Sequence, residues 1–101
     1  MLTSKQRAAL RGMSSRIETI IHIGKGGLTE TVKTQVEEAL TARELIKGKV
    51  LENAPVTPRE VCDILADLCA AEPIHVIGSK FVLYRPNPKL DAAKRIQLVR
   101  G

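Results

Sequence analysis

Aromatic side chains are nearly absent from this 101-residue chain, which has one phenylalanine, one tyrosine and no tryptophan. Aliphatic side chains must therefore fill its core. The same shortage argues against nucleobase recognition by a platform of several stacked aromatic rings. Hydrophobic residues still make up 44% of the chain, which excludes wholesale disorder and, at this length, predicts one domain with one modest core.

Cysteine is scarce as well. Cys62 and Cys69 are seven positions apart within one expected helix. That spacing is a rise of about 10 Å, too far for a disulfide between them. Two free thiols indicate a reducing compartment, so we expect a cytoplasmic protein. No apolar run approaches the ~20 residues of a membrane span, and the polar N-terminus has no secretory core, so we expect no membrane partner.

Recognisable catalytic and metal-binding patterns are missing. The two cysteines lack the spacing of a zinc site, and no nucleophile elbow or phosphate-binding Walker motif is present. His22 and His75 each fall inside an apolar stretch that predicts a strand, where a histidine is more often structural than a ligand. We therefore expect no enzyme, no metal, no cofactor and no small-molecule substrate. The remaining acidic pairs are expected to be solvated: Glu37 with Glu38, and Asp63 with Asp67.

Positive charge is what the chain has in excess, with a net charge of +5, and it is unevenly distributed. Residues 1–27 hold five Lys or Arg against one Glu, and residues 74–101 hold six against one Asp. Residues 28–45 and 57–73 are acidic, at −2 and −3. This segregation predicts one positive and one negative face, and a positive face favours a polyanionic partner. The alternative is solvated charge with no partner.

A glycine-rich segment, Ile23-Gly24-Lys25-Gly26-Gly27-Leu28-Thr29-Glu30, joins an apolar stretch to an amphipathic pattern. Thr29 is a good helix N-cap. Unpaired N–H groups and the helix dipole at such a junction suit a phosphate, and Lys25 adds a mobile cation. Gly24 and Gly27 form a G-x-x-G pattern, which in other proteins clamps nucleic-acid backbone. The alternative is a tight turn whose glycines only solve a steric problem.

Hydrophobic periodicity predicts an α/β domain in the order helix, strand, helix, strand, helix, strand, strand. Two strand–helix–strand units and a terminal hairpin predict a four-stranded mixed sheet. The expected elements are helices over residues 4–13, 29–43 and from 57 until Pro73 stops the third, and strands over residues 19–23, 45–51, 74–77 and 81–85.

Three of these elements carry distinctive local signals. On the second strand, Lys47 and Lys49 face away from Ile46 and Val50, so they are either solvated or a stripe that tracks phosphates. The third helix begins with the capping box Thr57-Pro58-Arg59-Glu60. Its expected buried stripe is Val61, Ile64, Leu65 and Leu68.

Four separated motifs resemble the bacterial YhbY proteins, which are stand-alone CRM (chloroplast RNA splicing and ribosome maturation) domains. The resemblance covers residues 2–86. The motifs are Leu2-Thr3-Ser4-Lys5-Gln6-Arg7, Ile23-Gly24-Lys25-Gly26-Gly27-Leu28-Thr29, Glu44-Leu45-Ile46-Lys47-Gly48-Lys49 and Val76-Ile77-Gly78-Ser79-Lys80-Phe81-Val82-Leu83-Tyr84-Arg85-Pro86.

This resemblance implies a fold similar to the C-terminal domain of translation initiation factor three. It also implies RNA binding and association with precursors of the large ribosomal subunit. Residues 87–101 lie outside it, and they are predicted either to form a mobile basic arm or to dock on a sheet edge through residues 96–99. We expect the protein to be a monomer.

The hypothesis that follows is capture of phosphate backbone by shape and charge. Tyr84 is expected to pack in the fold rather than stack on a base. The alternative is a protein-interaction module of the translation machinery whose basic face docks an acidic partner. The expected RNA-contacting residues are Gly24, Lys25, Gly26, Gly27, Leu28, Thr29, Lys47, Lys49, Lys80, Arg85, Arg7 and Arg11.

Overall fold

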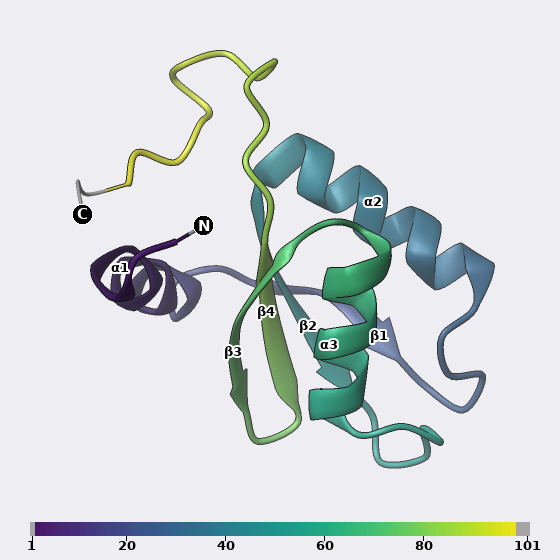
Figure 1. Ribbon diagram of the computed structural model, residues 1–101. Coiled ribbons are helices and arrows are strands. Elements are labelled where there is room, and N and C mark those ends of the chain that lie inside the picture. Colours follow the sequence, from purple (N-terminus) through teal and green to yellow (C-terminus); the bar gives the residue numbers. More distant parts are fainter. Residues whose placement is uncertain (1, 99–101) are drawn as a thin grey trace.

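The computed structural model describes residues 2–98 (Figure 1). Its element order is αβαβαββ, as the periodicity predicts. No helix among these residues is both long and apolar enough to cross a membrane. The elements are α1 (Ser4–Ser14), β1 (Thr19–Ile23), α2 (Glu30–Arg43), β2 (Leu45–Val50), α3 (Pro58–Leu68), β3 (Glu72–Ile77) and β4 (Lys80–Tyr84).

The four strands form one mixed sheet in the order β1-β2-β4-β3. β1 and β2 run parallel, while β4 is antiparallel to both of its neighbours, β2 and β3. The prediction of a four-stranded mixed sheet is confirmed. In this order β1 and β3 are the two edges, so residues distant in the sequence meet on the central strands.

Helices cover both faces of the sheet. α2 and α3 pack on one face over a cluster that includes Ile46, Leu65 and Phe81. α1 packs on the other face, which we call the α1 face, over Leu45 and Tyr84. Figure 1 shows α1 standing apart from the other two helices across the sheet. Burial of Tyr84 confirms that its ring packs within the fold.

The third helix begins where its capping box predicts, and it ends earlier than expected. The Thr57 hydroxyl accepts the N–H of Glu60, and the Glu60 carboxylate accepts the N–H of Thr57. The helix ends at Leu68 because Ala70 takes a positive φ of 52°. Pro73 therefore does not stop the helix: it lies within β3, at an edge where its missing N–H costs no ladder bond on the outer side.

The buried stripe of α3 is rotated relative to the prediction. Val61 and Leu65 are buried as expected, but Ile64 and Leu68 are 40% and 53% exposed. Cys62 and Cys69 take their places in the core, and both are free thiols. Burial raises the pKa of each thiol to about 11, helped by Asp63 beside Cys62 and by Glu37 beside Cys69. These thiols therefore serve as small apolar side chains.

The C-terminal residues return to the α1 face, and hydrogen bonds to the buried carboxylate of Glu44 hold them there. Glu44 caps α2 at a φ of 64° and is fully buried. Its carboxylate accepts the N–H groups of Asn87 (2.7 Å) and Ile96 (2.6 Å), and Arg95 lies 3.5 Å away. Ile96 and Leu98 pack against the cluster under α1, so they dock on a face of the sheet rather than on a sheet edge. Val99 lies outside the described residues. The division of the chain at residue 86 stays a prediction.

Candidate functional site

One end of the sheet gathers three loops, including the glycine-rich segment. β1 and β2 both finish there, and the β3–β4 hairpin turns there (Figure 1). The N–H of Leu51 donates to the carbonyl of Ile23 (2.8 Å), and the N–H of Val50 donates to the carbonyl of Ser79 (2.7 Å). These bonds tie the glycine loop, the segment after β2 and the hairpin into one surface.

The glycine loop is a tight turn that feeds α2. The N–H of Gly27 donates to the carbonyl of Gly24 (2.9 Å), and the Thr29 hydroxyl accepts the N–H of Val32 (3.2 Å). The N–H groups of Gly26 and Leu28 have no partner within the described chain. Lys25 and Gly26 are exposed, whereas Leu28 packs toward the core. The loop thus offers an anion two free N–H groups, the α2 dipole and one mobile cation.

Gly27 is a structural residue of this loop as well as a candidate contact. Its φ is 68°, and a Cβ there would lie 3.2 Å from Pro55. A β-branched residue would therefore strain the backbone, so Gly27→Val affects folding as well as any ligand. Gly26 has no positive φ, and a Cβ there would meet only Thr29, at an ordinary 3.7 Å. Gly26 is the position where the loop can be changed without strain.

A row of side chains crosses the sheet beside the loop on the α1 face. His22 pairs with Lys49 on the next strand, Lys49 with Lys80, and Lys80 with Ile77. Directly paired residues of neighbouring strands point to the same side, so these four side chains form one line about 14 Å long. Neither lysine forms an ion pair within residues 2–98.

Between this row and α1 lies a groove with a volume of about 520 Å³. Three of the predicted contact residues meet in it, Arg11 from α1, Lys47 from β2 and Lys80 from β4. Lys49 lies next to Lys80 across the ladder. The groove is lined by Arg11, Ser14, Ser15, Lys47, His75, Ile77, Gly78, Ser79 and Lys80.

Arg7 is held apart from this cluster. Its guanidinium donates to the carbonyl of Pro73 (2.8 Å) and to the carboxylate of Glu72 (3.2 Å). Glu72 pairs with Tyr84, at the opposite end of the ladder from the hairpin. Arg7 therefore fastens α1 to the edge strand, away from the groove.

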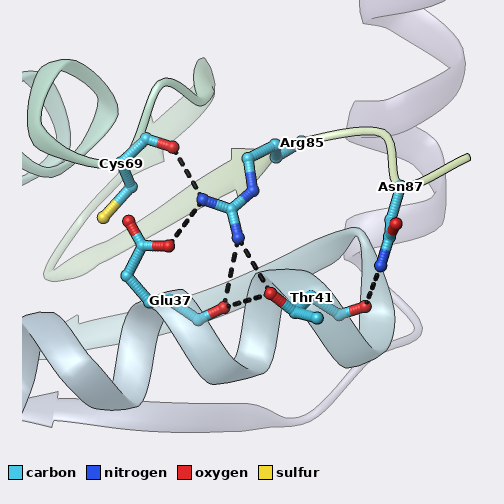
Figure 2. Close-up of polar contacts among 5 residues, drawn as sticks. All are labelled: Glu37, Thr41, Cys69, Arg85 and Asn87. Atoms are coloured by element: carbon cyan, nitrogen blue, oxygen red, sulfur yellow. Dashed lines mark hydrogen bonds and ion pairs between the residues drawn. The ribbon is translucent and has the colours of Figure 1, made fainter. Parts of the chain in front are cut away.

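Arg85 is also engaged inside the fold (Figure 2). One guanidinium nitrogen donates to the carboxylate of Glu37 and to the carbonyl of Cys69, both at 2.8 Å. The other donates to the carbonyl of Glu37 (3.2 Å) and to the hydroxyl of Thr41 (3.0 Å). Asn87 adds a bond to the carbonyl of Thr41 (2.8 Å). Arg85 thus fastens α2 and the end of α3 to the end of β4.

This clamp corrects the prediction that Glu37 is solvated. The hydrogen bond from Arg85 lowers the pKa of the Glu37 carboxyl below its ordinary value of 4.5, against the opposing effect of burial. Asp63 and Asp67 are exposed, as expected.

Three residues of this surface were not expected to belong to it: His22, His75 and Ile77. His22 is exposed rather than structural, because it alternates with the buried Ile21 and Ile23 along an edge strand. His75 and Ile77 line the groove with the lysines. Strand alternation places the side chain of His22 on the other face of the sheet from Ile21 and Ile23, so the sequence pattern could have predicted its exposure. Its pairing with Lys49 depends on the order of the strands in the sheet. No group of three His, Cys, Asp or Glu residues in the described part of the chain could hold a metal ion.

The chain belongs to the CRS1/YhbY (CRM) domain family, whose model matches residues 2–85. It is 38% identical over 85 residues to "Probable RNA-binding protein YqeI" of Bacillus subtilis, covering 84% of this chain and 88% of that protein. It is 33% identical over 99 residues to an "RNA-binding protein" of Haemophilus influenzae, covering 98% and 96%. A Staphylococcus aureus protein solved in solution is similar in fold, with a TM-score of 0.78, 37% identity and coverage of 98% and 100%.

Proposed function

We propose that this protein binds RNA. It holds the phosphate backbone with the G-x-x-G loop and with the lysines of the neighbouring row, Lys49 and Lys80, on the α1 face. The observation that carries the proposal is the pairing of Lys49 with Lys80 beside that loop. Like charges directly opposite on two strands destabilise a sheet, and no described carboxylate neutralises these two. An anion bound across them offsets that repulsion.

The loop and the row have separate tasks in this mechanism. The free N–H groups of Gly26 and Leu28, at the positive end of α2, hold one phosphate while Lys25 closes over it. Lys49 and Lys80 continue the track across the sheet toward Arg11 and the groove. Contacts to phosphate carry little sequence information, so binding depends strongly on salt and weakly on sequence.

Arg7 and Arg85 have structural tasks in this proposal. Their guanidinium groups are already paired with Glu72 and Glu37, and they lie at the other end of the sheet. The proposed contact set therefore consists of the loop from Gly24 to Thr29 together with Lys47, Lys49, Lys80 and Arg11. The protein acts as a monomer in the cytoplasm and catalyses no reaction.

The proposed RNA is ribosomal RNA within precursors of the large subunit. Relatives named as RNA-binding proteins support RNA as the partner, and the choice of ribosomal RNA rests on what membership in the CRM family implies. Crosslinking in cells followed by sequencing of the attached RNA tests it. We expect reads concentrated in large-subunit ribosomal RNA; reads spread over messenger RNA would contradict this partner.

Binding itself is tested by fluorescence anisotropy with a structured RNA over a series of salt concentrations. Lys25→Ala should weaken binding equally across RNA sequences and reduce the salt slope by about 0.7 to 0.9. Lys89→Ala is the matched control, because Lys89 is exposed and lies in the segment after β4, beyond the other end of the sheet. An unchanged slope in Lys25→Ala removes Lys25 from the contact set. No affinity for any RNA would favour docking of an acidic protein.

A further inference from the structure

We propose that the groove between α1 and the β3–β4 hairpin receives one unpaired nucleotide. The protein would then prefer an RNA helix with a bulge to the same helix fully paired. This inference rests on the proposed RNA binding and adds the structural class of RNA.

The groove has a composition that phosphate capture alone does not require. Arg11, Lys47 and Lys80 supply its charge from three different elements. Its volume of about 520 Å³ falls within the usual range of small-ligand sites. The hydroxyls of Ser14 and Ser15 already donate to α1 carbonyls, whereas that of Ser79 has no side-chain hydrogen bond within residues 2–98. Ser79 is thus available to a polar edge of a ligand.

Ile77 provides an apolar wall in this charged setting. Its side chain is 59% exposed, and it shares the α1 face with Lys80, its partner in the hairpin. A flat nucleobase can cover such a side chain, while the neighbouring lysines hold its phosphate. The only tyrosine cannot take this task, because Tyr84 is buried under α1.

A paired base cannot reach this wall. In an RNA helix the bases are stacked inside and the phosphates form a convex surface, which rests across the rim of a groove rather than entering it. A bulged nucleotide is already unpaired, so little further unstacking is needed to place it between α1 and the hairpin. The row from His22 to Lys80 leads the backbone from the glycine loop to this point.

The test compares two labelled RNA duplexes of one sequence, one fully paired and one with a single-nucleotide bulge, by anisotropy. The wild-type protein should bind the bulged duplex about fivefold more tightly, as one apolar contact provides. Ile77→Ser should bring this ratio close to one with little change in affinity for the paired duplex. Leu68→Ser is the matched control, since Leu68 is an exposed apolar residue on α3, across the sheet. Lys25→Ala should weaken binding to both duplexes and keep the ratio.

The outcomes separate the two proposals. Absence of RNA binding overturns the proposed function itself. Equal affinity of the wild-type protein for both duplexes, or an unchanged ratio in Ile77→Ser, overturns the groove as a nucleotide site while RNA binding stands. A second measurement does not depend on any variant: a photoreactive uridine at the bulge should crosslink to residues 77–80. Crosslinks only to the glycine loop would contradict the inference.

Discussion

Lys49 and Lys80 stand directly opposite each other on β2 and β4, and neither has a carboxylate partner among the described residues. A carboxylate at either position would face the remaining lysine and could form a cross-strand ion pair with it. Two like charges in register cost stability. We therefore interpret the pair as a feature that serves binding, although it lowers the stability of the sheet.

Charge reversal at one of the two lysines should therefore separate stability from binding. In Lys49→Glu the new carboxylate faces Lys80, so the free energy of unfolding should rise by up to about 1 kcal/mol while RNA affinity falls. Urea unfolding and anisotropy measure the two effects. Lys89→Glu makes the same change of net charge but has no strand partner. It should change both the free energy of unfolding and the RNA affinity less than Lys49→Glu does. A Lys49→Glu protein that binds RNA as well as the wild type would contradict the assignment of this row.

The glycine loop can be tested at Gly26 without backbone strain. Gly26→Asp places a carboxylate beside the two free N–H groups, where it competes with a phosphate, and RNA affinity should fall about tenfold. Its fold should be unharmed, because a negative charge near the N-terminus of α2 is favourable by about 0.3–1 kcal/mol. Gly26→Ala is the control for bulk and should bind almost normally. An equal loss of RNA affinity in both variants would mean that any side chain at this position blocks binding, whatever its charge.

Gly48 is required by the core and not by a turn. A Cβ at this position would overlap the ring of Phe81, which lies opposite it on β4. Gly48→Ala should therefore lower the free energy of unfolding by about 1–3 kcal/mol. Gly12→Ala is the matched control: nothing lies within 4 Å of a Cβ on this helical residue, so that variant should gain about 0.5–1 kcal/mol. Urea unfolding of both proteins is the measurement.

The Arg85 clamp predicts a pH dependence of stability. The pKa of Glu37 is lowered in the folded protein, so the stability it contributes is present above its ordinary value of 4.5 and is lost as the pH falls through the lowered pKa. The pair is partly exposed, which limits its contribution to about 1 kcal/mol. Glu37→Gln should thus be less stable than the wild type at pH 7, and the difference should shrink at pH 3. Glu38→Gln, an exposed neighbour, should show no such change; a difference in Glu37→Gln that persists at pH 3 would contradict this account.

Local signals in the sequence predicted where most elements begin. Thr57, Pro58 and Glu60 fix the start of α3 through contacts within one turn, and Thr29 does so for α2. The end of α3 was not predictable in this way, because it depends on the positive φ of Ala70, which is not a glycine. Its buried stripe was misplaced because the cysteines, which are apolar when buried, were not counted as core residues.

The candidate site was predictable only in part, for a similar reason. Alternation along β2 placed Lys47 and Lys49 on one face, as the structure has them. The pairing of Lys49 with Lys80 requires β4 to lie next to β2, and this sheet order is a property of the whole fold. The pairing of Arg85 with Glu37 joins residues 48 positions apart, so no local pattern showed that this cation is engaged.

The salt dependence of RNA binding tests the central claim most directly, when the wild-type protein is compared with a Lys47→Ala, Lys49→Ala, Lys80→Ala triple variant. Three lost phosphate contacts should reduce the slope of log affinity against log salt by about 2 to 3, with the fold intact. A triple variant that folds and keeps the wild-type slope would contradict the account.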